Sequence, residues 1–337
     1  MKIKKEYLIL ALIIAGLLVY LFLRERDRTL YELPVLPEVS KKEITKIEIT
    51  KGSTSIVLHK KDDRWYIGPR QYPADQNKIK AMLDVFEDLT LTTPVSESQN
   101  YVRYELNDEN KINAKAWQAD KLQRNFDIGK TASTFRHTFV KIAEDDRVFH
   151  ARNNFRNAFD QAAENLRDKV VLSFQISDIS GIEIKQEQTA LALTRTQIPV
   201  QDPPDKNDQA DAATSQPVNV VWQSADGKTG DDTKITRLLS TLSNLRCEKF
   251  IEDRQKEDFT AAVSTIQVKG AQNYRLSIFA KLNEEDSNYP AISSGSDYPF
   301  LLSQNTVDRI IKSPENLLEK PKMDETKSEA EKSESKP

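Results

Sequence analysis

Two short segments contain the Gly-Lys-Thr triplet that ends a phosphate-binding loop, at 129–131 and, within DGKTG, at 226–230. A phosphate-binding loop also needs a glycine five residues before the Gly-Lys pair, so that successive backbone N–H groups can surround the phosphates. Arg124 takes that place before the first triplet, and Trp222 takes it before the second. Both segments are therefore predicted to be turns that bind no nucleotide.

The three histidines, His59, His137 and His150, are the next candidates for metal or acid–base chemistry. None has the helical i, i+4 spacing typical of a metal site, and no cysteine supports them. His137 and His150 can face each other across a hairpin, which leaves two interpretations open: a weak metal site, or two partly exposed strand histidines. We favour the second interpretation and predict no metal ligand here.

Clustered carboxylates and the single cysteine give no stronger indication of catalysis. Paired carboxylates act as acid and base when one of them is desolvated. The clusters EDD (144–146) and NEED (283–286) fall in predicted hairpin loops, where carboxylates are solvated. Cys247 is the only cysteine, which excludes an intramolecular disulfide, and it is expected to be a small buried hydrophobic residue. We therefore predict a protein that is not an enzyme, with no catalytic residue and no cofactor.

An uncharged apolar segment, residues 7–23, lies near the N-terminus. As a helix it would be about 25 Å long, at the short end of what crosses a bilayer. The charged RERDR follows it directly where a cleaved signal peptide would carry small residues, so an uncleaved signal anchor is predicted. Residues 1–6 would be a cytoplasmic tail, although the basic residues on the two sides are nearly balanced. The bulk of the chain is then expected in the periplasm, held by a single pass through the inner membrane.

The 337 residues carry 49 basic and 52 acidic side chains, a net charge of −3, which argues against a nucleic-acid partner. Residues 24–39 form a proline-containing linker, predicted to be an extended spacer. Beyond it, apolar and polar residues alternate through 44–67, which predicts three antiparallel strands ending near Trp65. Residues 73–91 then predict an amphipathic helix with Asp75 as its N-cap.

A second set of strands is predicted after this helix, and a further helix through 158–171 closes the region. The three strand segments of this second set are 111–129, 136–146 and 147–153. The sequence thus predicts an α+β fold, mainly antiparallel strands packed with helices.

The chain then repeats itself in the same order. Residues 178–195 match 43–60, and ENLLEK at 315–320 matches ENLRDK at 164–169. Trp222 corresponds to Trp65, with the change of spacing explained by a Pro- and Asp-rich insertion. We predict two tandem modules followed by a tail, with the insertion and the tail disordered. These parts are module 1 at 40–172, module 2 at 173–320, the insertion at 198–217 and the tail at 321–337.

This ordered pattern resembles the domain of unknown function 4340 family. The residues that carry the likeness are the strands ending in Trp65, the PAD helix start at 73–75 and the LRDK segment at 166–169. In the second module GDDTK stands in place of PAD, and LLEK replaces LRDK. The resemblance implies a bacterial membrane-anchored protein associated with ABC-2-type export or gliding-motility auxiliary transport systems. It implies no catalytic residues.

Three functions are therefore considered. The preferred one is an accessory or scaffold subunit of an ABC-type envelope transporter, whose partners would be the membrane, a permease and an ATPase. The alternative is a periplasmic ligand- or glycan-binding module that uses Trp65 and Trp222, which predicts an exposed aromatic cleft. The third, an envelope hydrolase, requires histidines and carboxylates to converge in one pocket.

Overall fold

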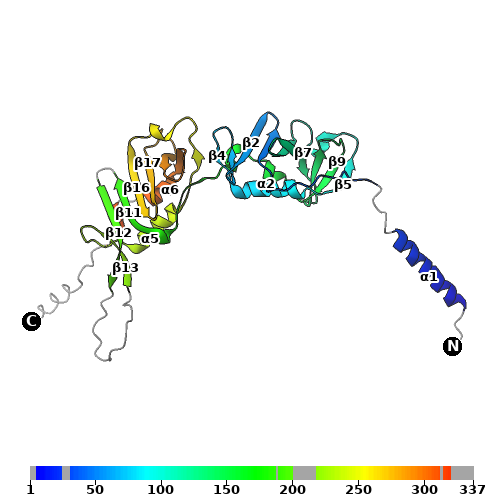
Figure 1. Cartoon of the computed structure of the whole chain (residues 1–337), viewed down its shortest axis with the longest axis horizontal. Helices are drawn as coiled ribbons and strands as arrows, with labels where there is room; N and C mark the ends of the chain where they lie inside the picture. The colour runs from blue at the N-terminus through cyan, green and yellow to red at the C-terminus, as the bar shows by residue number, and fades with distance from the viewer. Residues whose placement is uncertain (1–4, 25–30, 187–188, 200–217, 312–313, 320–337) are drawn as a thin grey trace, which may run out of the picture. The chain divides into compact units, whose positions relative to one another are not determined.

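The computed structural model describes residues 5–24, 31–186, 189–199, 218–311 and 314–319 (Figure 1). Most of the predicted insertion, all of the predicted C-terminal tail and parts of the predicted N-terminal tail and linker lie outside the described residues. The predicted apolar segment is helical, as α1 (Lys5–Arg24). In the described part of the chain, no helix combines the length and the apolar character that crossing a membrane requires.

The chain divides into two compact units, Met1–Asp168 (unit 1) and Lys169–Pro337 (unit 2). Both are built mainly of antiparallel sheet with a few helices, so the predicted α+β class is confirmed. The division falls slightly before the predicted boundary at 172/173. The reason is that β10 (Val170–Ser173) pairs with β14 (Asn244–Arg246), which belongs to unit 2.

Unit 1 contains a nine-stranded sheet in the order β4-β3-β2-β1-β6-β7-β8-β9-β5. Burial alternates along its strands, as at Ile47 and Ile49, so one face of the sheet meets the core. The strands are β1 (Lys46–Lys51), β2 (Thr54–Lys61), β3 (Arg64–Ile67), β4 (Tyr72–Pro73), β5 (Leu91–Ser96), β6 (Ile112–Gln118), β7 (Lys121–Thr131), β8 (His137–Ile142) and β9 (Val148–Arg152).

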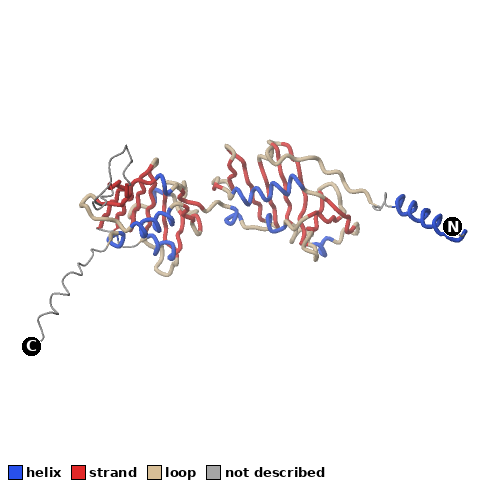
Figure 2. Tube along the Cα trace, turned by 90° about the horizontal axis from the view of Figure 1, so that it is seen from below, coloured by secondary structure: helices blue, strands red, loops and turns tan. Residues whose placement is uncertain are grey.

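Helix α2 (Gln76–Asp88) lies along this sheet (Figures 1 and 2). It begins where predicted, because the Asp75 side chain accepts hydrogen bonds from the backbone N–H groups of Asn77 and Lys78. Its core residues are Ile79, Met82 and Phe86. Phe86 packs edge-on against Phe126 of β7 and Phe159, with ring centroids 5.6 and 5.7 Å away.

Unit 2 contains an eight-stranded sheet in the order β13-β12-β11-β16-β17-β18-β19-β15. Its helices are α5 (Asp232–Leu242) and α6 (Gln304–Ile310), and the 3-10 turn η4 (Pro314–Leu317) follows them. The strands are β11 (Ile179–Gln186), β12 (Thr189–Pro199), β13 (Val218–Ser224), β15 (Lys249–Phe250), β16 (Ala262–Gly270), β17 (Asn273–Phe279), β18 (Asn288–Ser293) and β19 (Phe300–Ser303).

Without β4, the strand order in unit 1 is β3-β2-β1-β6-β7-β8-β9-β5. Unit 2 has the same order with ten added to each strand number, from β13 at one edge to β15 at the other. The N-caps of α2 and α5 are also held alike. Asp75 donates its backbone N–H to the carbonyl of Leu166 at 2.8 Å, and Asp231 donates to that of Leu317 at 2.7 Å. The two matching hexapeptides therefore occupy equivalent places, each against the N-terminus of the main helix.

The predicted helix through 158–171 is wrong. The structure has two four-residue helices there, α3 (Arg156–Phe159) and α4 (Ala163–Leu166), followed by strand β10. Beyond Leu166 the backbone is extended, and Asp168 donates its N–H to the carbonyl of Pro73 at 2.7 Å. Pairing with other segments replaces the intrahelical bonds that the local sequence favours.

The predicted linker is not a free spacer where the structure describes it. Residues 31–39, here called the strap, lie against unit 1. The Tyr31 hydroxyl donates to the carbonyl of Thr92 at 3.3 Å, and Arg147 donates to that of Glu32 at 3.2 Å. Arg124 is buried and donates to the carbonyl of Pro37, and Val39 is buried as well. The strap is thus part of the surface of unit 1.

Candidate functional site

Neither Gly-Lys-Thr segment forms a phosphate-binding loop. Residues 129–131 end strand β7, where a Cβ on Gly129 would lie 2.3 Å from the carbonyl oxygen of Tyr104. The glycine is needed for that close packing. Residues 226–230 form a turn after β13, in which Gly227 has a φ of +82° and Asp226 pairs with Lys228 at 2.8 Å. The predicted turn is therefore confirmed at 226–230 and wrong at 129–131, which belong to a strand because they pair within the sheet of unit 1.

The histidine pair does come together across the β8–β9 hairpin. The rings of His137 and His150 stack with centroids 5.2 Å apart, and Phe139 lies 4.7 Å from His150. Both rings are half-buried, whereas His59 is exposed on β2. Burial, and then the neighbouring His137, hold the pKa of His150 below its ordinary value. Across the described residues, no group of three His, Cys, Asp or Glu side chains is arranged to hold a metal ion.

The lowered pKa of His150 predicts a pH-dependent stability for unit 1. The unfolded chain takes up a proton near the ordinary pKa of 6.5, whereas the folded chain takes it up only at lower pH. The unfolding free energy should therefore fall as the pH drops below 6.5 and level off below the folded pKa. Urea unfolding at about pH 7.5 and about pH 5.5 measures this. The fall should be smaller in His150→Gln, and an equal fall in both proteins would contradict the assignment.

The acidic clusters are paired with cations or lie in turns. Asp145 makes a two-point contact with Arg147, at 3.1 Å to Nε and 2.7 Å to Nη2. That contact holds the pKa of Asp145 below its ordinary value. Asp146 pairs with Lys141 at 3.4 Å, and Asp286 accepts the backbone N–H of Asn283 at 3.2 Å. For Asp145 the contact favours the ionised carboxylate, not the raised pKa of a general acid.

Trp65 and Trp222 are buried, each only 4% exposed. They follow the same pattern in the two units. The backbone carbonyl of Trp65 accepts the N–H of Ala74, and the backbone carbonyl of Trp222 accepts the N–H of Gly230. Neither ring can stack on a ligand, so the aromatic cleft required by the binding-module alternative is not formed by these residues. Cys247 is also in the core, and burial raises the pKa of its thiol to about 12.

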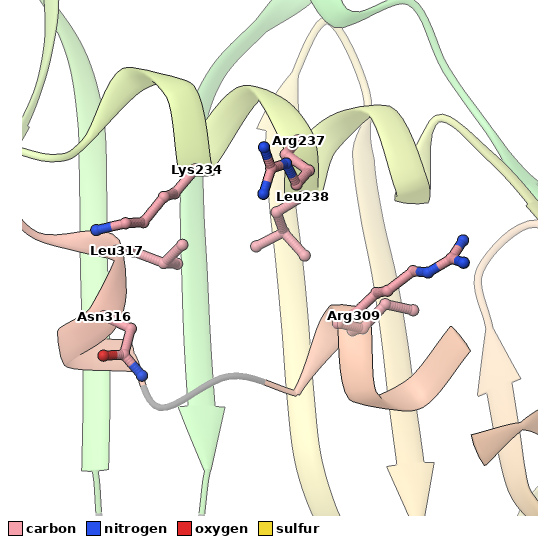
Figure 3. A pocket seen from close by; sticks show the side chains of 7 residues that line it. Lys234, Arg237, Leu238, Arg309, Asn316 and Leu317 are labelled. Carbon is pink, nitrogen blue, oxygen red and sulfur yellow. The ribbon is translucent and has the colours of Figure 1, made fainter. Parts of the chain in front are cut away.

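A small cleft lies in unit 2, where α5, α6 and η4 meet (Figure 3). It encloses about 40 Å³. Its apolar floor consists of Leu238, Ile310 and Leu317, all buried. Three cationic side chains and one amide also line it: Lys234, Arg237, Arg309 and Asn316. Arg237 comes from α5 and Arg309 from α6, and the Arg309 side chain points away from Arg237 (Figure 3), so cations from two helices lie at the edge of one apolar depression. Sequence reasoning missed this cleft, because its residues come from three separate segments.

A family model described as Domain of unknown function (DUF4340) matches residues 65–263. The chain belongs to this family. The DUF4340 match begins at Trp65 in β3 of unit 1 and ends within β16 of unit 2, so it spans the junction of the two units. No curated protein and no solved structure matches the chain. The family description gives no activity.

Proposed function

We propose that the chain is a non-enzymatic, extracytoplasmic accessory or scaffold subunit of an ABC-type envelope transport system, anchored in the inner membrane through residues 7–23. The observation that carries the proposal is an exposed apolar helix, α1, joined to unit 1 by a short segment. Large apolar side chains of α1 are exposed, among them Leu12 at 71% and Leu18 at 61%. A lone helix with such a surface needs a bilayer or another apolar partner to cover it.

The docked strap limits how far unit 1 can stand from this helix. Its first residue, Tyr31, is already bound to unit 1, so the chain between Arg24 and Tyr31 spans at most about 25 Å. An anchored α1 would therefore keep unit 1 close to the membrane surface, where a permease presents its extracytoplasmic loops. This arrangement suits a subunit that acts on a membrane partner better than one that captures solutes far from the membrane.

We further propose that the two units are tandem copies of one module, broadly residues 40–172 and 173–320. The shared strand order and the equivalent hydrogen bonds at Asp75 and Asp231 support this. Two similar modules in series suit a scaffold, because each copy can diverge to bind a different surface. Hydrolysis and aromatic ligand binding have less support, since the histidines, carboxylates and tryptophans discussed above are engaged in packing or ion pairs.

Cysteine labelling tests the topology. In a Cys247→Ser background, Ser53→Cys places one thiol in the exposed turn between β1 and β2, and Lys2→Cys places one before α1. A membrane-impermeant maleimide should label Ser53→Cys in cells with a permeabilised outer membrane, and Lys2→Cys only after lysis. The opposite pattern would contradict the extracytoplasmic placement. The untouched chain should remain unlabelled until it is unfolded, because Cys247 is buried.

A further inference from the structure

Two arginines on the rim of the unit 2 cleft have no ion-pair partner in the described part of the chain. Arg237 on α5 and Arg309 on α6 are both exposed and both line the cleft. Lys234, by contrast, pairs with Asp231 at 2.8 Å. Among the described residues that line the cleft there is no carboxylate. The cations left without an ion pair among these described residues are the two guanidinium groups.

The equivalent place in unit 1 lacks both arginines. Counted from the N-caps Asp75 and Asp231, Ala81 takes the position of Arg237. Counted back from Leu166 and Leu317, Ala158 and Phe159 take the positions of Arg309 and Ile310.

The buried Phe159 ring packs on Phe86 and Phe126 at 5.7 and 6.3 Å and occupies this part of unit 1. Ile310 is smaller, so the corresponding region of unit 2 stays open. The two arginines and the smaller Ile310 thus occur together at this place in unit 2.

We propose that the unit 2 cleft binds an oxyanion, a phosphate or a carboxylate, carried on a short apolar group. Guanidinium groups bind these planar or tetrahedral oxyanions with two-point hydrogen bonds. The buried floor of Leu238, Ile310 and Leu317 offers apolar contact beside them. The proposal does not depend on the transport role, because it rests on unit 2 alone.

Calorimetric titration with butyl phosphate tests the proposal, using the full chain in phosphatidylcholine nanodiscs and empty nanodiscs as the blank. Butyl phosphate should bind at least about tenfold tighter than inorganic phosphate or butanol. Arg237→Ala and Arg309→Ala should each weaken it about tenfold, the loss of one charge-assisted hydrogen bond. Arg275→Ala is the matched control, since Arg275 is exposed on β17 and does not line the cleft.

A filling variant separates the two parts of the site. Ile310→Phe introduces the residue found at this place in unit 1 and should remove the advantage of butyl phosphate over inorganic phosphate while both arginines remain. Equal binding by wild type and the two arginine variants would overturn the proposal, as would butanol binding as tightly as butyl phosphate. Thermal unfolding of each variant confirms that it is folded.

The source of the oxyanion is identified by competition. If phosphatidic acid nanodiscs displace butyl phosphate, the ligand is a lipid headgroup; if they do not, it is a soluble ester or carboxylate. Either result supports an oxyanion site provided that the arginine variants have lost binding.

Discussion

Phe86→Ala is expected to lower the unfolding free energy of unit 1 by about 3–5 kcal/mol, the usual cost of emptying a large aromatic site. Phe86 is fully buried and touches Phe126 and Phe159 edge-on, so two neighbouring rings lose contacts at once. These neighbours belong to β7 and α3, and they cannot collapse into the space without moving the sheet away from α2.

Urea unfolding of the full chain measures this effect, with Lys80→Ala on the exposed face of α2 as the control. Each unit has its own core, so the transition assigned to unit 2 should stay where it is. A loss below about 1 kcal/mol would contradict the packing around Phe86. An equal shift of both transitions would contradict the division into two independent cores.

Gly129→Ala is expected to destabilise unit 1 by about 2–3 kcal/mol, through overpacking. The new Cβ would lie 2.3 Å from the carbonyl oxygen of Tyr104 and 2.9 Å from a side-chain carbon of Leu106. The closer of these two atoms, the carbonyl oxygen, belongs to the backbone and cannot rotate away. The Tyr104 ring also packs on Phe139, with ring centroids 4.9 Å apart. The loop that contains Tyr104 must therefore move away from β7.

Gly181→Ala in β11 provides the matched control for this substitution. Its new Cβ would meet its nearest neighbour, the carbonyl oxygen of Leu193, at 3.5 Å, an ordinary contact. It should change stability by less than about 1 kcal/mol. If Gly129→Ala proved as mild as Gly181→Ala, the close approach of Tyr104 to β7 would be wrong.

The first hairpin of unit 1 and the start of helix α2 could be predicted from the sequence because local patterns specify them. Apolar alternation around Ile47 and Ile56 produces the first hairpin, and its turn contains Gly52 with a φ of +55°. Asp75 begins α2 because its side chain satisfies two N–H groups that a helix leaves unpaired. Such signals lie within a few residues of their effect.

The predictions fail where distant segments decide the structure. Residues 158–171 have helical composition, but their backbone groups bond to a distant segment. The carbonyl of Leu166 accepts the N–H of Asp75, and Asp168 donates its N–H to the carbonyl of Pro73. The sequence predicts an extended spacer at 24–39, but Arg124 and Arg147, distant in the sequence, donate hydrogen bonds to backbone carbonyls of the strap. Local propensity is worth a fraction of a kcal/mol per residue, which tertiary hydrogen bonds readily exceed.

The unit 2 cleft was beyond prediction for a related reason. Arg237 and Arg309 look like ordinary solvated residues on two helices, and they lie 72 positions apart in the sequence. Their significance comes from the meeting of α5 and α6 in the fold and from the comparison with Ala81 and Ala158. That comparison was available in the sequence once the modules were aligned, but it had no meaning before the cleft was known.

Affinity purification from membranes in a mild detergent tests the proposed role most directly, with the full chain and a variant lacking residues 1–24 compared side by side. The account predicts that an ABC-type permease and its ATPase co-purify with the full chain in near-equal amounts, and that both are depleted when the anchor is absent. Recovery of the full chain alone, free of permease and ATPase, would contradict it.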